Sequence, residues 1–334
     1  MEAVMKVEAK SGIEIRNVPV PKVKPGWTLI KVKACGICGS DVHIYEWTPG
    51  YEVIIPFMPC ILGHEFSGEV IMIGKGTTEI EQGNRVFMGP SKVYLTRQNR
   101  QLPKRYGPFA SGGMAEYALV PTDTLWVLPE TVSYEVGAMV EPLHVAMQAV
   151  FLSKIMPGES AVILGPGPIG LLTLLSLKAA GVFVFMIGKD VDEQRLRLAK
   201  SLGADVVLNA DEIEPVSSVL EMFRNGVDAV FEATGVPATI QQGLNMVKKN
   251  GKVIAIGIHS SPANINMLDL VRSSKHLIGS YGGPLSVWTR ELALLDQGLI
   301  NPKPLVSHKL PLDKAAKGFE WCIKKTGIKI LLTP

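Results

Sequence analysis

Three separate stretches of this chain contain side chains that bind metal ions well. Together they offer thiolate, imidazole and carboxylate groups, a donor set that suits zinc, and a catalytic zinc site leaves one position open for a substrate. We therefore expect these stretches to converge on a single metal ion. They read CGICGSDVH at 35–43, GHE at 63–65 and EP at 141–142.

Each of these side chains also has an ordinary structural explanation. Cys35 and Cys38 form a CxxC that could act as a redox pair, although it lies outside the βαβ setting that such pairs favour. A single histidine such as His64 is more often structural than metal-bound. Glu141 is different, because it interrupts the apolar run VGAMVEPLHVAMQAV, where an unpaired carboxylate would be costly. It needs a cationic partner, and His144, one helical turn later, is either a rival ligand or a packed side chain.

A glycine-rich turn follows the apolar segment AVIL at 161–164 and leads into the helix-like LLTLLSLKAAG. In such a setting the first glycine permits a tight turn, the second lets a pyrophosphate approach the backbone, and the third lets helix and strand pack closely. The phosphates then meet the N-terminus of the helix. The turn therefore predicts a dinucleotide-binding site. Its residues are Gly165, Pro166, Gly167, Pro168, Ile169 and Gly170.

The residues after the next expected strand leave the choice of dinucleotide open. An acidic residue about 20 positions after the glycines binds the ribose hydroxyls of NAD. Here the strand VFVFMI ends in Gly188, Lys189 and Asp190. Gly188 and Lys189 would provide room and charge for the 2′-phosphate of NADP, whereas Asp190 would repel that phosphate and suit NAD. Arg195, in the helix-like segment that follows, is a further cofactor-binding candidate.

The pattern of strands and helices divides the chain into two domains. With 334 residues, the chain exceeds the size at which a single core keeps growing. Short alternating runs are typical of strands in the N-terminal part, and later a regular alternation of strands and helices indicates a parallel, doubly wound sheet. We expect a mostly-β domain at 1–150 and 286–334 and a nucleotide-binding domain at 151–285. The six strands of the latter are expected near 161–164, 182–187, 205–208, 228–232, 252–257 and 276–280.

Composition excludes several functional classes. The 34 basic and 31 acidic residues give a net charge of +3, and the basic residues are scattered, so we expect no nucleic-acid partner. Charged residues, glycine and proline interrupt every apolar stretch, so neither a signal peptide nor a membrane span is expected. The four cysteines are too few for a disulfide framework in a chain of this size, which favours a reducing, cytoplasmic compartment.

In combination these motifs resemble the zinc-dependent medium-chain dehydrogenase/reductase family, within it the sorbitol, threonine and butanediol dehydrogenase branch. GICGSDVH, ILGHEFSGEV, VEPL, GPGPIGLL and RLAKSLGAD occur in the family's order and close to its spacing, over nearly the whole chain. The resemblance implies an α/β protein with a GroES-like, mostly-β catalytic domain and a Rossmann domain. It also implies hydride transfer between a secondary alcohol, such as a polyol, a diol or threonine, and NAD or NADP.

The resemblance assigns the metal ligands. It implies one catalytic zinc ion per subunit, held by Cys38 rather than Cys35 and by His64 and Glu65. Glu141 resembles a fourth residue that either touches the zinc or holds its bound water.

The resemblance also assigns the residues around the metal and the nicotinamide. Ser40 and His43 match the proton relay of the family, and Asp41 matches the carboxylate that orients the ligating histidine. Two strand-end loops, Thr234-Gly235 and Gly257-Ile258, resemble loops that pass the nicotinamide and its ribose.

One family feature is missing. Many members carry four closely spaced cysteines that bind a structural zinc ion, but the corresponding segment here, PSKVYLTRQNRQLPKRYGPFAS at 90–111, contains none. We therefore expect no structural zinc. Relatives are commonly dimers or tetramers, which implies a homo-oligomer.

Three other functions stay open at this point. The chain could be another zinc-dependent alcohol or aldehyde dehydrogenase. A metal-free quinone or enone reductase on the same scaffold would not need Cys38, His64 and Glu65 together. A non-catalytic protein with this fold would typically have lost a ligand or relay residue, and none is lost here.

Overall fold

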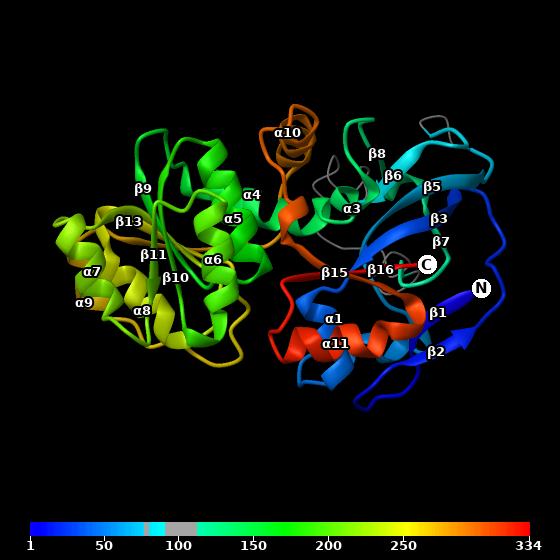
Figure 1. The fold of residues 1–334 in the computed structure, drawn as a ribbon, viewed down its shortest axis with the longest axis horizontal. Helices are drawn as coiled ribbons and strands as arrows, with labels where there is room; N and C mark the ends of the chain where they lie inside the picture. Colours follow the sequence, from blue (N-terminus) through cyan, green and yellow to red (C-terminus); the bar gives the residue numbers. More distant parts are fainter. Residues whose placement is uncertain (77–79, 91–111) are drawn as a thin grey trace. The chain divides into compact units, whose positions relative to one another are not determined.

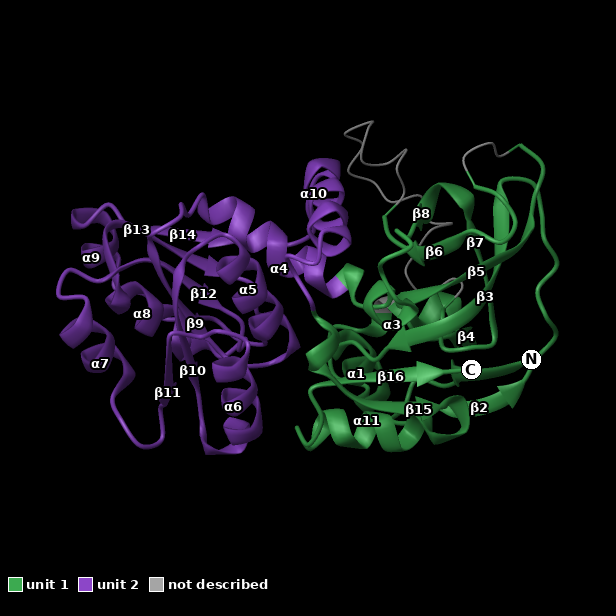
Figure 2. Ribbon diagram, turned by 45° about the horizontal axis from the view of Figure 1, so that its top comes forward, with its two compact units in different colours: residues 1–141, 302–334 green, residues 142–301 purple. Residues whose placement is uncertain are grey.

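The computed structural model describes residues 1–76, 80–90 and 112–334, which divide into two compact units (Figure 2). Unit 1 contains Met1–Glu141 and Pro302–Pro334, and unit 2 contains Pro142–Asn301. The boundaries between the two units therefore fall at 141/142 and 301/302, whereas the sequence predicted domain boundaries at 150/151 and 285/286. The difference arises because α4 (Val140–Ser153) and α10 (Leu285–Asp296) pack on each other, with the rings of His144 and Trp288 stacked at 3.8 Å. The segment that is expected to lack a structural zinc ion spans residues 90–111, and residues 91–111 of it are not among the described residues.

Unit 1 is built around the long strand β3 (Trp27–Gly36), which is buried along most of its length. The larger sheet has the order β15-β16-β3-β5-β6-β8, with β7 also paired to β3, and a smaller sheet has the order β2-β1-β4. Figure 1 shows the red C-terminal strand β16 beside the blue β3. The remaining strands are β1 (Glu2–Lys6), β2 (Glu14–Asn17), β4 (Cys60–Ile61), β5 (Glu65–Ile73), β6 (Arg85–Met88), β7 (Tyr117–Pro121), β8 (Leu125–Val127), β15 (Val306–Pro311) and β16 (Lys329–Thr333).

Short helices fill the turns of unit 1. The longer ones are α1 (Gly39–Glu46) and α11 (Ala315–Ile323), which contact each other. The other helices among the described residues of unit 1 are α3 (Tyr134–Gly137) and the 3-10 turns η1 (Glu52–Phe57), η2 (Thr122–Thr124), η4 (Lys303–Leu305) and η5 (Leu312–Lys314).

Unit 2 contains a six-stranded parallel sheet in the order β11-β10-β9-β12-β13-β14. The six strands expected from the sequence are all present, and the doubly wound arrangement is confirmed. Because the strands are parallel, their carboxyl ends lie along one edge, where such sheets bind ligands. The strands are β9 (Ser160–Leu164), β10 (Phe183–Gly188), β11 (Val206–Asn209), β12 (Val227–Glu232), β13 (Val247–Ala255) and β14 (His276–Gly279).

Helices connect these strands, and α5 and α6 pack against β10 while α8 packs against β12 and β13. Among the described residues, no helix combines the length and the apolar composition that a membrane crossing requires. The helices are α5 (Pro168–Ala179), η3 (Asp190–Asp192), α6 (Glu193–Ser201), α7 (Pro215–Met222), α8 (Pro237–Met246) and α9 (Met267–Arg272).

Candidate functional site

Three of the four expected metal ligands come together in unit 1. The donor atoms of Cys38, His64 and Glu65 all lie within 4.8 Å of one another. Strand pairing explains their meeting, because β3 and β5 are antiparallel and Gly36 lies opposite Glu65. Cys38 follows β3 by two residues and caps α1, while His64 directly precedes β5. A fixed sheet register thus places a thiol, an imidazole and a carboxylate at one point.

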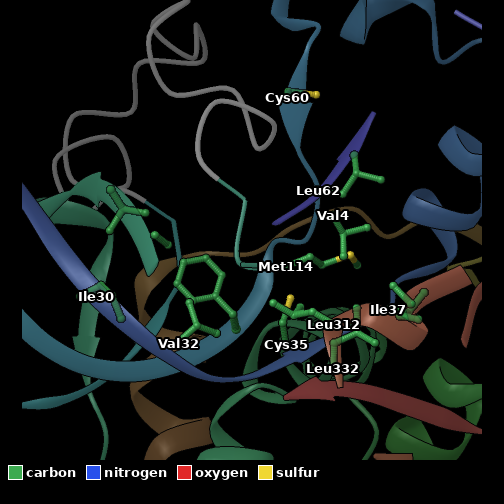
Figure 3. Packing of buried hydrophobic residues seen from close by; sticks show 14 of the residues in the cluster. Val4, Ile30, Val32, Cys35, Ile37, Cys60, Leu62, Met114, Leu312 and Leu332 are labelled. Atoms are coloured by element: carbon green, nitrogen blue, oxygen red, sulfur yellow. The ribbon is translucent and has the colours of Figure 1, made fainter. Parts of the chain in front are cut away.

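The two cysteines of the CxxC motif have different surroundings. Cys35 is fully buried in β3 among apolar side chains such as Leu62 and Met114 (Figure 3). Burial raises the pKa of the Cys35 thiol well above its usual value. Cys38 is only half-buried and neighbours His64 and Glu65. The motif therefore supplies one residue to the core and one to the donor cluster.

Asp41 contacts two members of the cluster, Cys38 and His64. Its side chain is completely buried, and burial raises its pKa. One carboxylate oxygen, Oδ2, accepts a hydrogen bond from the backbone N–H of Cys38 at 3.0 Å. The other, Oδ1, lies 3.8 Å from His64 Nδ1 and, within the described part of the chain, has no hydrogen-bond partner. A carboxylate behind a histidine is the arrangement that orients metal-binding imidazoles.

The electrostatics of the cluster favour a cation. Burial alone lowers the pKa of His64, but the charges of Cys38 and Asp41 more than offset this and raise the pKa well above its usual value. His64 therefore lies close to two acidic groups, the Cys38 thiol and the Asp41 carboxyl. A thiol, an imidazole and a carboxylate in such a setting fit a zinc ion.

Lys329 is a member of this cluster that the sequence analysis did not single out. It is the first residue of β16, almost completely buried, and its Nζ pairs with Glu65 Oε2. The same amine donates a hydrogen bond to the carbonyl of Ile37 at 3.2 Å. Gly36 makes room for the pair, because a Cβ there would overlap Glu65 Oε2 and lie 2.8 Å from Lys329 Cε. A lysine opening the apolar run KILLT was the available signal.

Glu141 lies at the edge of the cluster, in the first turn of α4. Burial raises the pKa of its carboxyl, and the nearby charges of His64 and Glu65 act on it in opposite directions. Its oxygens are not among the donor atoms within 4.8 Å of one another in the described residues. The rival ligand His144 belongs to unit 2, where it is buried against Trp288, with its Nδ1 3.6 Å from Glu291 Oε2.

The two expected relay residues lie one turn apart on α1. Ser40 is half-buried, whereas His43 is exposed and stacks on Tyr51 with ring centroids 5.2 Å apart. His43 Nδ1 lies 3.1 Å from Thr48 Oγ1, a neighbour that the sequence analysis did not identify. No hydrogen bond joins Ser40 to His43 in the described residues, so a relay through both needs an intervening group.

The glycine turn of unit 2 has the geometry that a dinucleotide requires. Gly165 has a positive φ of 99°, and a Cβ there would lie 2.8 Å from Thr234 Cγ2. A Cβ on Gly170 would overlap the carbonyl oxygen of Gly165. Gly167, the N-cap of α5, has no atom within 4 Å of its Cβ position. The outer glycines are thus required by packing, and the middle one leaves space beside the helix N-terminus, where Pro168 and Ile169 begin α5.

The two loops expected beside the nicotinamide lie against each other at the carboxyl ends of β12 and β13. Glu232 Oε1 accepts hydrogen bonds from the backbone N–H groups of Thr234 at 2.7 Å and Gly235 at 3.0 Å. A Cβ on Gly235 would lie 2.8 Å from the carbonyl oxygen of Ile258.

Glu232 also anchors the second loop. Its Oε2 lies 3.3 Å from His259 Nε2, and a Cβ on Gly257 would lie 2.8 Å from the same oxygen. Glu232 and His259 escaped the sequence analysis, although a glutamate ending the apolar run VDAVFE was a signal. One buried carboxylate thus fixes both loops.

The carboxyl end of β10 holds the remaining cofactor-binding candidates. Gly188 is the last residue of β10, and Lys189 and Asp190 follow it, both exposed. Arg195, almost buried in α6, contacts Asp192 Oδ1 through Nη1 at 3.3 Å.

The family assignment rests on known relatives. Residues 24–130 match the alcohol dehydrogenase GroES-like domain, and residues 168–297 match the zinc-binding dehydrogenase family. An L-threonine 3-dehydrogenase from Pyrococcus horikoshii is 36% identical over 332 residues, covering 96% of this chain and 94% of that protein. The chain belongs to the zinc-dependent medium-chain dehydrogenase/reductase family.

Solved structures of the same family agree over the full length. The crystal structure of 2R,3R-butanediol dehydrogenase from Bacillus subtilis has a TM-score of 0.89 and 33% identity, covering 100% of this chain and 99% of that chain. A zinc-binding dehydrogenase from Sinorhizobium meliloti, bound to NADP, has a TM-score of 0.86 and 29% identity, with coverage of 100% and 99%. These structures confirm the GroES-like and Rossmann architecture expected from the sequence.

Membership of the medium-chain dehydrogenase/reductase family also confirms the enzyme class. The chain is a zinc-dependent oxidoreductase that acts on alcohols, and zinc and NAD or NADP are its cofactors. The donor cluster of unit 1 and the glycine turn of unit 2 are the parts of this family member whose geometry fits those two cofactors.

Proposed function

We propose that this chain oxidises secondary alcohols that carry a second polar group, such as polyols, diols or hydroxy-amino acids, and uses one catalytic zinc ion per subunit. The observation that carries the proposal is the convergence of Cys38, His64 and Glu65 within 4.8 Å. The substrate class is supported by the relatives, which act on threonine and butanediol.

Cys38, His64 and Glu65 would hold the zinc ion. Asp41 keeps the His64 ring in place from behind, and Lys329 restrains the Glu65 carboxylate. Glu141, at the edge of the cluster, would contact either the metal or a water molecule on it. The bound cofactors supply Lewis acidity toward the alcohol oxygen and a hydride acceptor for the carbinol carbon.

The protein's own chemistry is the removal of the alcohol proton. Ser40 lies two residues after Cys38 in the sequence, closer to it than His43 does, and would receive that proton first. His43 is exposed at the other end of the turn, with Thr48 Oγ1 on its Nδ1, and would pass the proton to solvent. General base catalysis of this kind contributes about 10²–10⁴-fold to rates.

Unit 2 would bind and orient the dinucleotide. The space at Gly167 and the N-terminus of α5 suit its pyrophosphate. The loops at Thr234-Gly235 and Gly257-Ile258, fixed by Glu232, would hold the ribose and nicotinamide.

Zinc content and substrate oxidation together test the proposal. The purified protein is analysed for metal and offered polyols, butanediols and threonine with each nucleotide. Cys38→Ala and His64→Ala should lose both zinc and turnover while nucleotide binding survives. Cys60→Ala, which removes a thiol from a core strand outside the cluster, serves as the control and should keep zinc. Normal turnover by a metal-free Cys38→Ala protein would favour the metal-free reductase alternative.

We also propose that the chain forms a dimer or tetramer. Strand β14 closes the six-stranded sheet, and within the described residues its outer edge has no strand partner. Exposed apolar side chains on this strand and just after it include Leu277 and Tyr281. Light scattering coupled to size-exclusion chromatography measures the number of subunits.

All four cysteines are free thiols, which supports the expected reducing, cytoplasmic setting.

A further inference from the structure

Helix α1 ends in a backbone motif that brings Thr48 beside His43. Trp47, the residue after the helix, has a left-handed backbone with a φ of 60°. Its N–H donates a hydrogen bond to the carbonyl of Ile44 at 3.3 Å, and the N–H of Thr48 donates one to the carbonyl of His43 at 3.0 Å. These two bonds form a Schellman motif, in which the residue after the left-handed one lies against the last turn of the helix. The end of the helix therefore fixes the position of Thr48 next to His43.

The hydroxyl of Thr48 makes two contacts with the same histidine. Its Oγ1 donates a hydrogen bond to the carbonyl oxygen of His43 at 3.3 Å and lies 3.1 Å from His43 Nδ1. A hydroxyl has a single hydrogen, and a carbonyl oxygen can only accept. Because the Thr48 hydrogen points at the carbonyl, the hydrogen between Oγ1 and Nδ1 must belong to the imidazole. The neutral His43 ring then carries its hydrogen on Nδ1 and has a lone pair on Nε2.

Tyr51 restrains the same ring from one face. The ring centroids of His43 and Tyr51 lie 5.2 Å apart, with an interplanar angle of 22°. Among the described residues, the hydrogen bonds of the imidazole are confined to Nδ1, and the side chain of His43 is exposed. The ring is thus held at Nδ1 and on one face, and its Nε2 can accept a proton.

We propose that Thr48 is a positioning residue for the dehydrogenase reaction, because it holds His43 in the tautomer whose Nε2 accepts the alcohol proton. The proposal rests on the proposed function, in which His43 passes this proton to solvent. The proton adds to the lone pair of Nε2 and gives an imidazolium ion, and a water molecule then takes the proton from Nε2. The other tautomer already carries a hydrogen on Nε2, so it cannot accept a proton there.

The tautomer of His43 can be measured without turnover. The histidines of the zinc-loaded, full-length protein are labelled with ¹⁵N, and nitrogen–proton correlation spectra are recorded above the pH range in which imidazoles titrate. The signal that disappears in His43→Asn identifies His43 among the six histidines. The unmodified chain should carry the hydrogen on Nδ1. A hydrogen found mainly on Nε2 would overturn the proposal.

Two substitutions of Thr48 and one control connect the tautomer to the reaction. Thr48→Val keeps the branched shape but removes the hydroxyl, so the Nδ1–H tautomer should lose population. Its kcat should fall about 10-fold, part of the roughly 10²–10⁴-fold contribution of general base catalysis, while KM and zinc content stay unchanged. Thr48→Ser restores the hydroxyl and should recover both the tautomer and kcat. Thr289→Val removes an exposed hydroxyl that bonds to carbonyls of its own helix α10, and it should change neither.

The outcomes separate this proposal from the proposed function. An unchanged tautomer or an unchanged kcat in Thr48→Val would refute the role of Thr48. A failure of the unmodified chain to oxidise any alcohol, with the hydrogen on Nδ1, would overturn the proposed function and leave standing the control of the His43 tautomer by Thr48. Thermal melts check that the variants are folded.

Discussion

Lys329 and Glu65 form a buried ion pair that joins the first residue of β16 to the first residue of β5. The relative exposures of their side chains are 2% and 1%. Burial lowers the pKa of Lys329, but the charges of Glu65 and Cys38 more than offset this and raise it. The C-terminal strand therefore supplies a positive charge to a cluster otherwise rich in acidic groups.

Lys329→Met should destabilise the metal-free protein by about 3 kcal/mol, because it leaves Glu65 buried without its partner. Saturating zinc should reduce this loss, since the metal returns positive charge to the same carboxylate. Urea unfolding with chelator and with zinc measures both values. Lys309→Met, which breaks an exposed ion pair with Glu135, should cost no more than about 1 kcal/mol. A stable metal-free Lys329→Met protein would contradict the prediction.

Asp41→Asn should weaken zinc binding about 10- to 100-fold while leaving the fold intact. An asparagine oxygen can still accept the Cys38 N–H and cap α1, but it lacks the charge that faces His64. Competition with a chromophoric chelator measures the affinity. Glu46→Gln, an exposed change on the same helix, is the control. If both variants bind zinc like the unmodified chain, Asp41 has no orienting role.

Gly167→Ala and Gly170→Ala should fail in different ways. A methyl group on Gly167 meets no protein atom, so this variant should fold normally and lose at least about 10-fold in nucleotide affinity, as the methyl occupies the phosphate approach. A methyl group on Gly170 overlaps the Gly165 carbonyl, so that variant should unfold more easily. Melting curves and calorimetry distinguish the two. Tight nucleotide binding by Gly167→Ala would argue against the phosphate site.

His144 should make stability depend on pH. Burial lowers its pKa from 6.5 to about 4 in the folded chain, so the unfolded chain binds more protons between these values. Stability is therefore fully present above pH 6.5 and falls as the pH drops toward 4, by roughly 3 kcal/mol at most. Unfolding measured from pH 4 to pH 7 should show a shallower slope for His144→Phe than for the unmodified chain. His276→Ala, at an exposed position, should keep the original slope.

Local patterns were sufficient for most of the fold. The alternation of apolar strands and helices located all six strands of unit 2, because each pattern depends on neighbours along the chain. The domain limits were harder to place. The run VEPLHVAMQAV shows an apolar helix, but the partner of that helix depends on packing with α10, and sequence does not record such long-range contacts.

The residues of the candidate site also include some that local sequence patterns indicate and others that only long-range contacts reveal. The convergence of Cys38, His64 and Glu65 could be expected from sequence, because side chains that can bind metal stand in short motifs. Lys329 was missed because it contacts Glu65 only through the pairing of β16 with β3, and 264 residues separate the two in sequence. The close packing around Gly188 could not be predicted from sequence either, because a Cβ there would meet the side chains of Pro166 and Leu196.

The position of β16 also affects how the chain can be made. This strand lies inside the larger sheet of unit 1, between β15 and β3, whereas unit 2 is one uninterrupted segment. During synthesis on the ribosome, the first 141 residues must wait for the last strand before their sheet is complete, and unit 2 can fold in the meantime. Glu65 therefore gains its lysine partner only after the whole of unit 2 has been synthesised, and a chain truncated before Lys329 retains unit 2 but lacks the cation that pairs with Glu65.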